Sequence, residues 1–440
     1  MLTGSVWKSI LFFTLPILGG LLLQQLYATV DGIIVGNLVS AAALGAVGTC
    51  TPVTAFLVAF ASGFSTGFGI IFAQFFGAGE QEKMRRSYST ILIIMAVAGV
   101  VFMLVGLLGG LPILRDLLQV PAEALDMAVT YIKIYSLGMI FQMIYNAQAA
   151  ALRSMGDSGS TLLFLVISTV VNILLDLAFV ALLHWDVAGV AIATVIAQGV
   201  SVLAAVVYIR KKYPQLRLGK LVFDREYAGL IAKLGIPTAL QSSALSLGSL
   251  GLQRLVNSFG SSMMEAYTAA GRIESFVTMP IISLNIGIST FTGQNIGAGQ
   301  PERLKKGLRA SLLMGAVSVA AIAAVVIGLA KPLVGLFGCT GRALELGCSY
   351  LVFMASTLII FMVLFTFKGL LNGAGDVAVP MVITVASMVV RIVFAYVAAK
   401  YIGERAIWYS IAVDFTFGSI PFIIRYYQGG WKKKAVSVKA

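Results

Sequence analysis

The sequence is poor in residues that bind metals or form cross-links. It has 3 cysteines and 1 histidine among 440 residues. The cysteines, Cys50, Cys339 and Cys348, are too few and too scattered for a disulfide framework or a metal cage. His184 stands next to Trp185 at the expected end of a membrane span, and one histidine cannot build a zinc site alone. We interpret the cysteines as packing residues and His184 as an interfacial side chain.

Charged residues are also scarce. They make up 11% of the chain, hydrophobic residues make up 59%, and the mean hydropathy is +0.95. An ordinary soluble protein carries about 25% charged residues. The composition therefore predicts an all-α polytopic membrane protein, in contact with membrane lipids. The net charge of +13 does not indicate nucleic-acid binding, because the basic residues gather in the connections on one side of the membrane.

Motifs for catalysis or for ATP binding are missing. The sequence contains no G-x-x-x-x-G-K-[ST] phosphate loop, no H-E-x-x-H and no G-x-S-x-G, and these are the usual signatures of ATPases, zinc proteases and serine hydrolases. We therefore expect a protein that is not an enzyme and needs no cofactor. An ion gradient is then the natural source of energy.

Apolar runs long enough to cross a bilayer, roughly 20 residues, occur twelve times. We expect 1–209 to form an N-lobe, 210–226 a linker, 227–427 a C-lobe and 428–440 a basic tail anchored at anionic headgroups. No cleavable signal is evident, and the distribution of Lys and Arg predicts that both termini are cytoplasmic. The expected spans are 9–37, 44–75, 88–114, 124–150, 161–184, 187–209, 227–257, 262–295, 307–335, 343–371, 378–402 and 405–427.

The two halves of the chain resemble each other. Ala73–Arg86 aligns with Gly293–Lys306 at an offset of 220 residues, Leu152–Asn172 aligns with Leu371–Arg391, and Pro16 pairs with Pro237. Six spans per half give parallel repeats related by an axis along the membrane normal. We expect two six-helix bundles around a central cleft, which is an architecture typical of transporters. A duplicated scaffold without transport is the alternative, but it leaves the polar residues inside the spans unexplained.

Acidic residues stand inside several spans. A charge at the centre of a bilayer costs at least about 2.5 kcal/mol, so each acid needs a proton, a partner or a wet cavity. Asp31, Asn172, Asp176 and Thr194 belong to three spans and are expected to converge. Two neighbouring carboxylates cannot both stay ionised without a cation, which predicts a coupling site for H⁺ or Na⁺. The alternative is a hydrogen-bonded pair that only locks helices together.

Further polar residues accompany these acids. Gln24 and Tyr27 share the helical face of Asp31, and Pro16 removes a backbone hydrogen bond earlier in the same span. The second half carries a different polar set, in which Arg391 occupies the repeat position of Asn172. We expect structural ion pairing rather than substrate contact for this set: Arg254, Arg272, Glu274, Arg391 and Asp414.

The motifs TGQNIGAGQPER, LRSMGD, NGAGD and VDGIIVG, with the N-x-x-x-D of the fifth span, resemble those of the multidrug and toxic compound extrusion (MATE) family. The resemblance covers essentially the whole chain and is strongest to the prokaryotic DinF-like type. It implies a secondary antiporter of the prokaryotic plasma membrane. The sequence does not indicate an oligomeric state, and we take the monomer as the default. Such a protein exports small organic compounds, often cationic, in exchange for H⁺ or Na⁺ by alternating access.

The resemblance also implies residue roles. Asp31, Asn172, Asp176 and Thr194 would couple the ion, and Pro16 would be the point at which the first helix bends. A cavity in the N-lobe would be lined by Gln24, Tyr27 and Asn146. The chain departs from the NorM type, because the seventh span offers Gln253 and Arg254 in place of an acid. A lipid-linked precursor flippase, or an exporter of an unidentified metabolite, remain the alternative functions.

Overall fold

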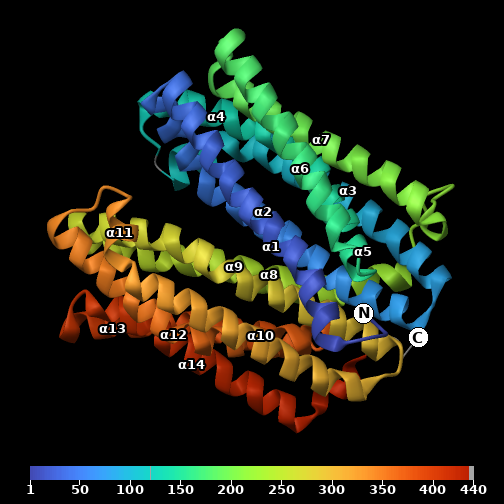
Figure 1. The fold of residues 1–440 in the computed structure, drawn as a ribbon. Helices are drawn as coiled ribbons and strands as arrows, with labels where there is room; N and C mark the ends of the chain where they lie inside the picture. Colours follow the sequence, from blue (N-terminus) through green and yellow to red (C-terminus); the bar gives the residue numbers. More distant parts are fainter. Residues whose placement is uncertain (119, 436–440) are drawn as a thin grey trace. The chain divides into compact units, whose positions relative to one another are not determined.

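The structure is a computed structural model that describes residues 1–118 and 120–435. The end of the predicted basic tail, with Lys439, lies outside the described residues. Contacts divide the chain into two compact units: unit 1 is Met1–Leu18 with Leu240–Ala440, and unit 2 is Gly19–Ala239 (Figure 1). The described helices are α1 (Val6–Ile34), α2 (Ala41–Ala78), α3 (Gln81–Pro112), α4 (Ala122–Leu137), α5 (Met139–Ser154), α6 (Ser158–Asp176), α7 (Asp186–Lys212), α8 (Arg225–Ser258), α9 (Ser261–Gly297), α10 (Pro301–Gly328), α11 (Ala330–Gly335), α12 (Gly341–Gly373), α13 (Ala378–Ile402) and α14 (Arg405–Gln428).

The described residues form helices and connections without strands. Ten helical segments are long and apolar enough to cross a membrane, and the bent pair α4 and α5 makes an eleventh. Helix α8 has 34 residues but is less apolar, because it carries Gln241, Gln253 and Arg254. The prediction of an all-α polytopic membrane protein is confirmed.

Two predicted spans were wrong in detail. The span expected at 124–150 is broken at Gly138, where α4 and α5 meet at 45°. Glycine is a poor residue for a helix interior, and a Cβ on Gly138 would lie 2.5 Å from Oε1 of Gln198. The span expected at 307–335 begins at Pro301, ends at Gly328, and is followed by the separate short helix α11. Proline is well suited to the first position of a helix, which explains the earlier start.

One helix lies at the centre of each unit. In unit 2 both pieces of the broken helix, α4 and α5, contact α2, α3 and α7. In unit 1 the unbroken helix α12 contacts α9, α10 and α14, and the long helices α12, α13 and α14 lie side by side (Figure 1). Most side chains of α5 and α12 are therefore buried within their unit, whereas α4 buries mainly the face that carries Tyr131 and Ile132.

The internal repeat is visible in the backbone. Gly79 and Gly299, 220 residues apart, have φ angles of 75° and 66°. Gly156 and Gly375 in the second pair of aligned segments have φ angles of 89° and 86°. Left-handed backbone favours glycine and commonly ends helices. Each half thus ends two of its helices with the same turn, and the aligned glycines serve the same purpose.

Two helices belong partly to each unit. The boundaries fall within α1, after Leu18, and within α8, after Ala239, shortly after Pro16 and Pro237. In unit 2, a Cβ on Gly67 of α2 would lie 2.5 Å from the backbone of Gly235 in α8. In unit 1, a Cβ on the equivalent Gly287 of α9 would meet the side-chain methyl group of Thr14 in α1. The first part of each of these two helices therefore packs on the second helix of the other half.

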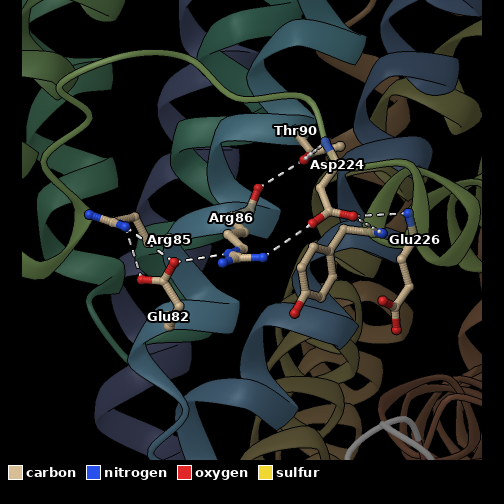
Figure 2. Close-up of polar contacts among 7 residues, drawn as sticks. Glu82, Arg85, Arg86, Thr90, Asp224 and Glu226 are labelled. Carbon is tan, nitrogen blue, oxygen red and sulfur yellow. Dashed lines mark hydrogen bonds and ion pairs between the residues drawn. The ribbon is translucent and has the colours of Figure 1, made fainter.

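The segment between α7 and α8 is attached to unit 2. The backbone N–H of Val222 donates to Oγ of Ser89 at 2.6 Å, and that of Asp224 donates to Oγ1 of Thr90 at 3.2 Å. Asp224 then lies 3.8 Å from Arg86 of α3, while its other oxygen accepts from the backbone N–H of Glu226 at 3.0 Å (Figure 2). Asp224 thereby satisfies a free N–H at the start of α8 and fixes this helix start beside α3.

Asp157 holds together the ends of α6 and α7. Its Oδ2 accepts hydrogen bonds from the hydroxyls of Tyr208 and Tyr213, both at 2.8 Å, and from Nζ of Lys212 at 3.0 Å. Burial alone would raise the pKa of Asp157, but these three hydrogen bonds outweigh it and hold the pKa below its ordinary value. At the aligned position in unit 1, Asp376 accepts from Arg425 at 2.7 Å.

We expect Asp157→Asn to lower the free energy of unfolding at pH 7 by about 1.5–3 kcal/mol, because hydrogen bonds to an ionised group are lost. A depressed pKa stabilises the fold above the ordinary value near ~4 and loses its effect as the pH falls through the lower pKa of the folded state. The difference in free energy of unfolding between wild type and Asp157→Asn should therefore become smaller as the pH falls below about 4. Thermal unfolding in detergent at several pH values measures this difference. The exposed pair of Asp116 with Arg115 provides the control: Asp116→Asn should change little.

Candidate functional site

Asp31 of α1 and Asp176 of α6 meet inside unit 2. Their side chains lie close enough to interact electrostatically, and Asp176 is fully buried. Two neighbouring buried carboxylates cannot both stay ionised without a cation, so the pair must hold a proton or bind a cation. The Oδ1 atoms of both residues are buried and have no hydrogen-bond partner among the described residues. The pair thus has unused acceptor capacity.

An amide and two hydroxyls complete the arrangement. In the orientation that satisfies both ends of its amide, Asn172 donates to Oδ2 of Asp176 at 2.8 Å and accepts from the backbone N–H of Thr194 at 3.2 Å. The hydroxyl of Thr194 donates to the carbonyl of Val190 at 3.0 Å and lies 3.3 Å from that of Tyr27. Residues from α1, α6 and α7 therefore come together, as the sequence led us to expect.

Both acids stand just before a segment of π-helix. Asp31 lies in the last turn of α1, which continues as η1 (Val35–Val39). Asp176 is the last residue of α6, which continues as η3 (Leu177–Leu182), and η1 contacts η3. π-Helical turns are rare and often occur at functional sites. Their position beside both carboxyls supports a functional role for this pair.

Two tyrosines of α4 are neighbours of the site that sequence reasoning missed. Tyr131 and Tyr135 are one helical turn apart and stack with their ring centres 5.8 Å apart. Both interact electrostatically with Asp31. Tyr131 also belongs to an apolar cluster that includes Ile34, Val35 and Val180. The sequence YIKIY places Tyr131 and Tyr135 on one helix face, but it does not show which residues they contact.

The three remaining predicted residues of the N-lobe do not join the acids through a described contact. Gln24 is exposed, and Asn146 donates to the carbonyl of Gln142 in its own helix at 2.8 Å. Pro16 lies inside the continuous helix α1, in the part that belongs to unit 1. Tyr27 is the one predicted cavity residue that contacts the site.

The polar residues predicted in the second half separate into two groups. Arg391 and Asp414 form an ion pair at 3.5 Å, and Glu274 accepts from the hydroxyl of Tyr350 at 2.6 Å. Arg254 and Arg272 are exposed and take no part in these contacts. Arg272 and Glu274, two residues apart on α9, thus point to different surroundings.

The donor set at the Asp31–Asp176 pair suits a small cation better than a transition metal. Within 1–118 and 120–435, no group of three or more His, Cys, Asp or Glu side chains could hold a metal ion. The atoms gathered here are carboxyl, amide and hydroxyl oxygens. Oxygens of this kind accept protons or hard cations.

Comparisons with known proteins agree with this architecture. The model of the MatE family matches residues 16–178 and 237–397. The probable multidrug resistance proteins YoeA and YpnP of Bacillus subtilis are each 28% identical to the chain. Each alignment covers 98% of this chain and 96% of the relative. A solved outward-facing multidrug resistance MATE family transporter of the MOP superfamily has a TM-score of 0.88, with 24% identity and 98% coverage of both chains.

The family model matches the same stretch of both halves, and together the two matches span well over half of the chain. They include the acids on α1 and α6 and the whole of the aligned motifs. The chain therefore belongs to the MATE family, whose members are membrane transporters and not enzymes.

Proposed function

We propose that the protein is a secondary active antiporter that exports organic compounds in exchange for protons, with Asp31 and Asp176 as the groups that carry the coupling ion. The observation that supports this most strongly is the position of two neighbouring carboxyls inside unit 2, with Asp176 fully buried and held by Asn172. Buried acids in a membrane protein are costly and usually mark ion or proton pathways. A pair that shares one proton can release it and accept it again as the transporter cycles.

The geometry favours a proton over Na⁺. The two carboxyls are electrostatic neighbours, and a single proton on the pair removes the repulsion between them without any further ligand. Asn172 donates to Asp176 and so occupies an oxygen that a metal ion would need. Thr194 and Tyr27 hold the third helix against the pair. Bending of α1 at Pro16 would then follow the change in charge on Asp31.

The substrate class rests on the relatives. Several are named as multidrug resistance or multidrug export proteins, from Bacillus subtilis and Staphylococcus aureus among others. By this likeness the transported compounds are varied small organic molecules, often cationic, and the protein lies in a prokaryotic plasma membrane with both termini in the cytoplasm. We propose that one chain suffices for transport.

Efflux from proteoliposomes tests this proposal. Purified protein is reconstituted with ethidium inside, and the membrane potential is held at zero with potassium and valinomycin. A pH gradient at equal sodium and a sodium gradient at equal pH are applied separately. We expect the pH gradient to drive efflux and the sodium gradient to have no effect. Efflux driven by sodium alone would overturn the choice of ion, and efflux driven by neither gradient would overturn antiport of organic cations.

A further inference from the structure

Unit 1 contains a cavity that the proposed coupling mechanism does not use. Its volume is about 360 Å³, and it lies among α8, α9, α12, α13 and α14. Polar and charged side chains share its walls with apolar and aromatic ones. Phe361 packs at a tilt against Phe365 and Phe415, with ring centres 4.2 Å and 4.8 Å apart. Cavities of this size that combine apolar walls with a few polar groups are typical of small-molecule sites.

Lys368 of the central helix α12 lines this cavity. It is 7% exposed, so nearly all of its side chain is removed from the surface of the unit. Among the described residues it forms no ion pair, and its Nζ lies 5.0 Å from the ring centre of Phe365. Asp414 interacts electrostatically with Lys368 but is already paired with Arg391. No described residue accepts a hydrogen bond from Nζ of Lys368, so this ammonium group retains capacity to bind an acceptor.

The acids around the cavity already have partners. Asp414 is paired with Arg391, and Glu274 accepts from Tyr350. Arg391 still has a buried Nε atom without a hydrogen-bond partner. The hydroxyls of Thr278 and Thr384 donate to carbonyls of their own helices and add no donor to the cavity. The free hydrogen-bond donors that line this space are therefore Lys368, Arg391 and the neutral hydroxyl of Tyr267.

We propose that this cavity is a binding site for a small organic acid, with Lys368 binding the acidic group and the phenylalanines enclosing an aromatic or otherwise apolar body. A carboxylate accepts charge-assisted hydrogen bonds from an ammonium and from a guanidinium N–H. It would satisfy both cationic donors together. The site is separate from the Asp31–Asp176 pair, and its ligand has the opposite charge to the organic cations expected of that proton-coupled export.

A purely structural role explains Lys368 less well. A lysine that holds helices together would donate a hydrogen bond to an acid or a carbonyl, whereas Lys368 interacts with Asp414 only at longer range and donates to no described residue. In the register that places Arg391 opposite Asn172, the position of Lys368 is Ala149 in the first half. The repeat therefore folds with a methyl group at this place, and the lysine adds a charge rather than a necessary contact.

Calorimetric titration of the purified full chain in detergent tests the proposal with one ring system in three charge states. The probes are 1-naphthoate, 1-naphthamide and 1-naphthylmethylammonium. We expect naphthoate to bind roughly tenfold or more tightly than either of the others, since a charge-assisted hydrogen bond is gained. Dodecanoate, an acid with a flexible chain, forms a fourth arm. Weaker binding of dodecanoate supports a compact acid, and tighter binding identifies a lipid-derived acid as the source of the same carboxylate.

Variants test whether Lys368 is responsible for the preference for naphthoate. Lys368→Met should abolish the preference for naphthoate, Lys368→Arg should retain it, and the exposed Lys400→Met should leave it unchanged. Lys368→Met should also unfold at the wild-type temperature or above, because an apolar side chain replaces a buried charge. The proposal is overturned if the amine binds as tightly as the acid, if the preference survives in Lys368→Met, or if this variant unfolds at a clearly lower temperature. Binding is measured without transport, so these outcomes are independent of the proposed antiport.

Discussion

Asp31→Asn is expected to reduce ethidium efflux driven by a pH gradient to the level of protein-free liposomes, and Asp176→Asn should do the same. An amide matches a carboxyl in size but cannot take up or release a proton at physiological pH. Because the two carboxyls are electrostatic neighbours, loss of either one also removes their competition for a single proton. Each single variant should therefore have nearly the full effect of the double variant.

Asp116→Asn provides the matched control for this pair. The chemical change is identical, but Asp116 is exposed and paired only with its neighbour Arg115, so efflux should remain at the wild-type level. The variants should also be compared by binding of ethidium to purified protein. Retained binding together with lost efflux would place the defect in coupling. Coupled efflux that persists in both Asp31→Asn and Asp176→Asn would show that the pair serves only to hold α1 and α6 together.

Gly67→Ala is expected to damage unit 2 strongly, although it adds only one methyl group. The new Cβ would lie 2.5 Å from the backbone nitrogen and Cα of Gly235, and backbone atoms cannot rotate away as a side chain can. Overpacking of this kind costs about 1–3 kcal/mol. Since this contact holds the first part of α8 against α2, we expect both the unfolding temperature and transport to fall.

Two further Gly→Ala variants provide a scale for the expected loss of stability. Gly287→Ala, at the equivalent position of unit 1, meets only the methyl group of Thr14, and its effect should be smaller because that side chain can move. Gly229→Ala in α8 meets nothing within 4 Å and should stabilise the helix by about 0.5–1 kcal/mol. Thermal unfolding in one detergent measures all three. An unfolding temperature of Gly67→Ala equal to that of Gly229→Ala would contradict the close crossing of α2 and α8.

The sequence was sufficient for the helices and for the repeat. Runs of apolar residues longer than a bilayer leave few alternatives to a helix, and the aligned glycines mark equivalent turns. The break at Gly138 could not be predicted, because it depends on how closely α7 approaches. The sequence also did not show that α1 and α8 are each divided between the two units. Pairing Pro16 with Pro237 located the equivalent points, but which helix packs on Gly67 depends on contacts distant in sequence.

The sequence also revealed only part of the candidate site, because it shows unusual residues but not the contacts between helices. Asp31, Asn172 and Asp176 are conspicuous because a polar residue inside an apolar run needs an explanation. Tyr131 and Tyr135 are not, since a tyrosine in a span is ordinary. Lys368 stands close enough to the end of its span to be counted with the residues at the membrane surface. Its burial becomes evident only once α12 is known to lie at the centre of its unit.

The most direct test of the central claim is the initial rate of ethidium efflux under a pH gradient, with sodium absent from both sides and the membrane potential held at zero. The claim is that the Asp31–Asp176 pair exchanges a proton for the transported compound. It predicts rapid efflux by the wild type that ceases when the pH gradient is collapsed with nigericin, and none by Asp176→Asn. Equal rates for the two proteins, or a wild-type rate that appears only when sodium is added, would contradict it.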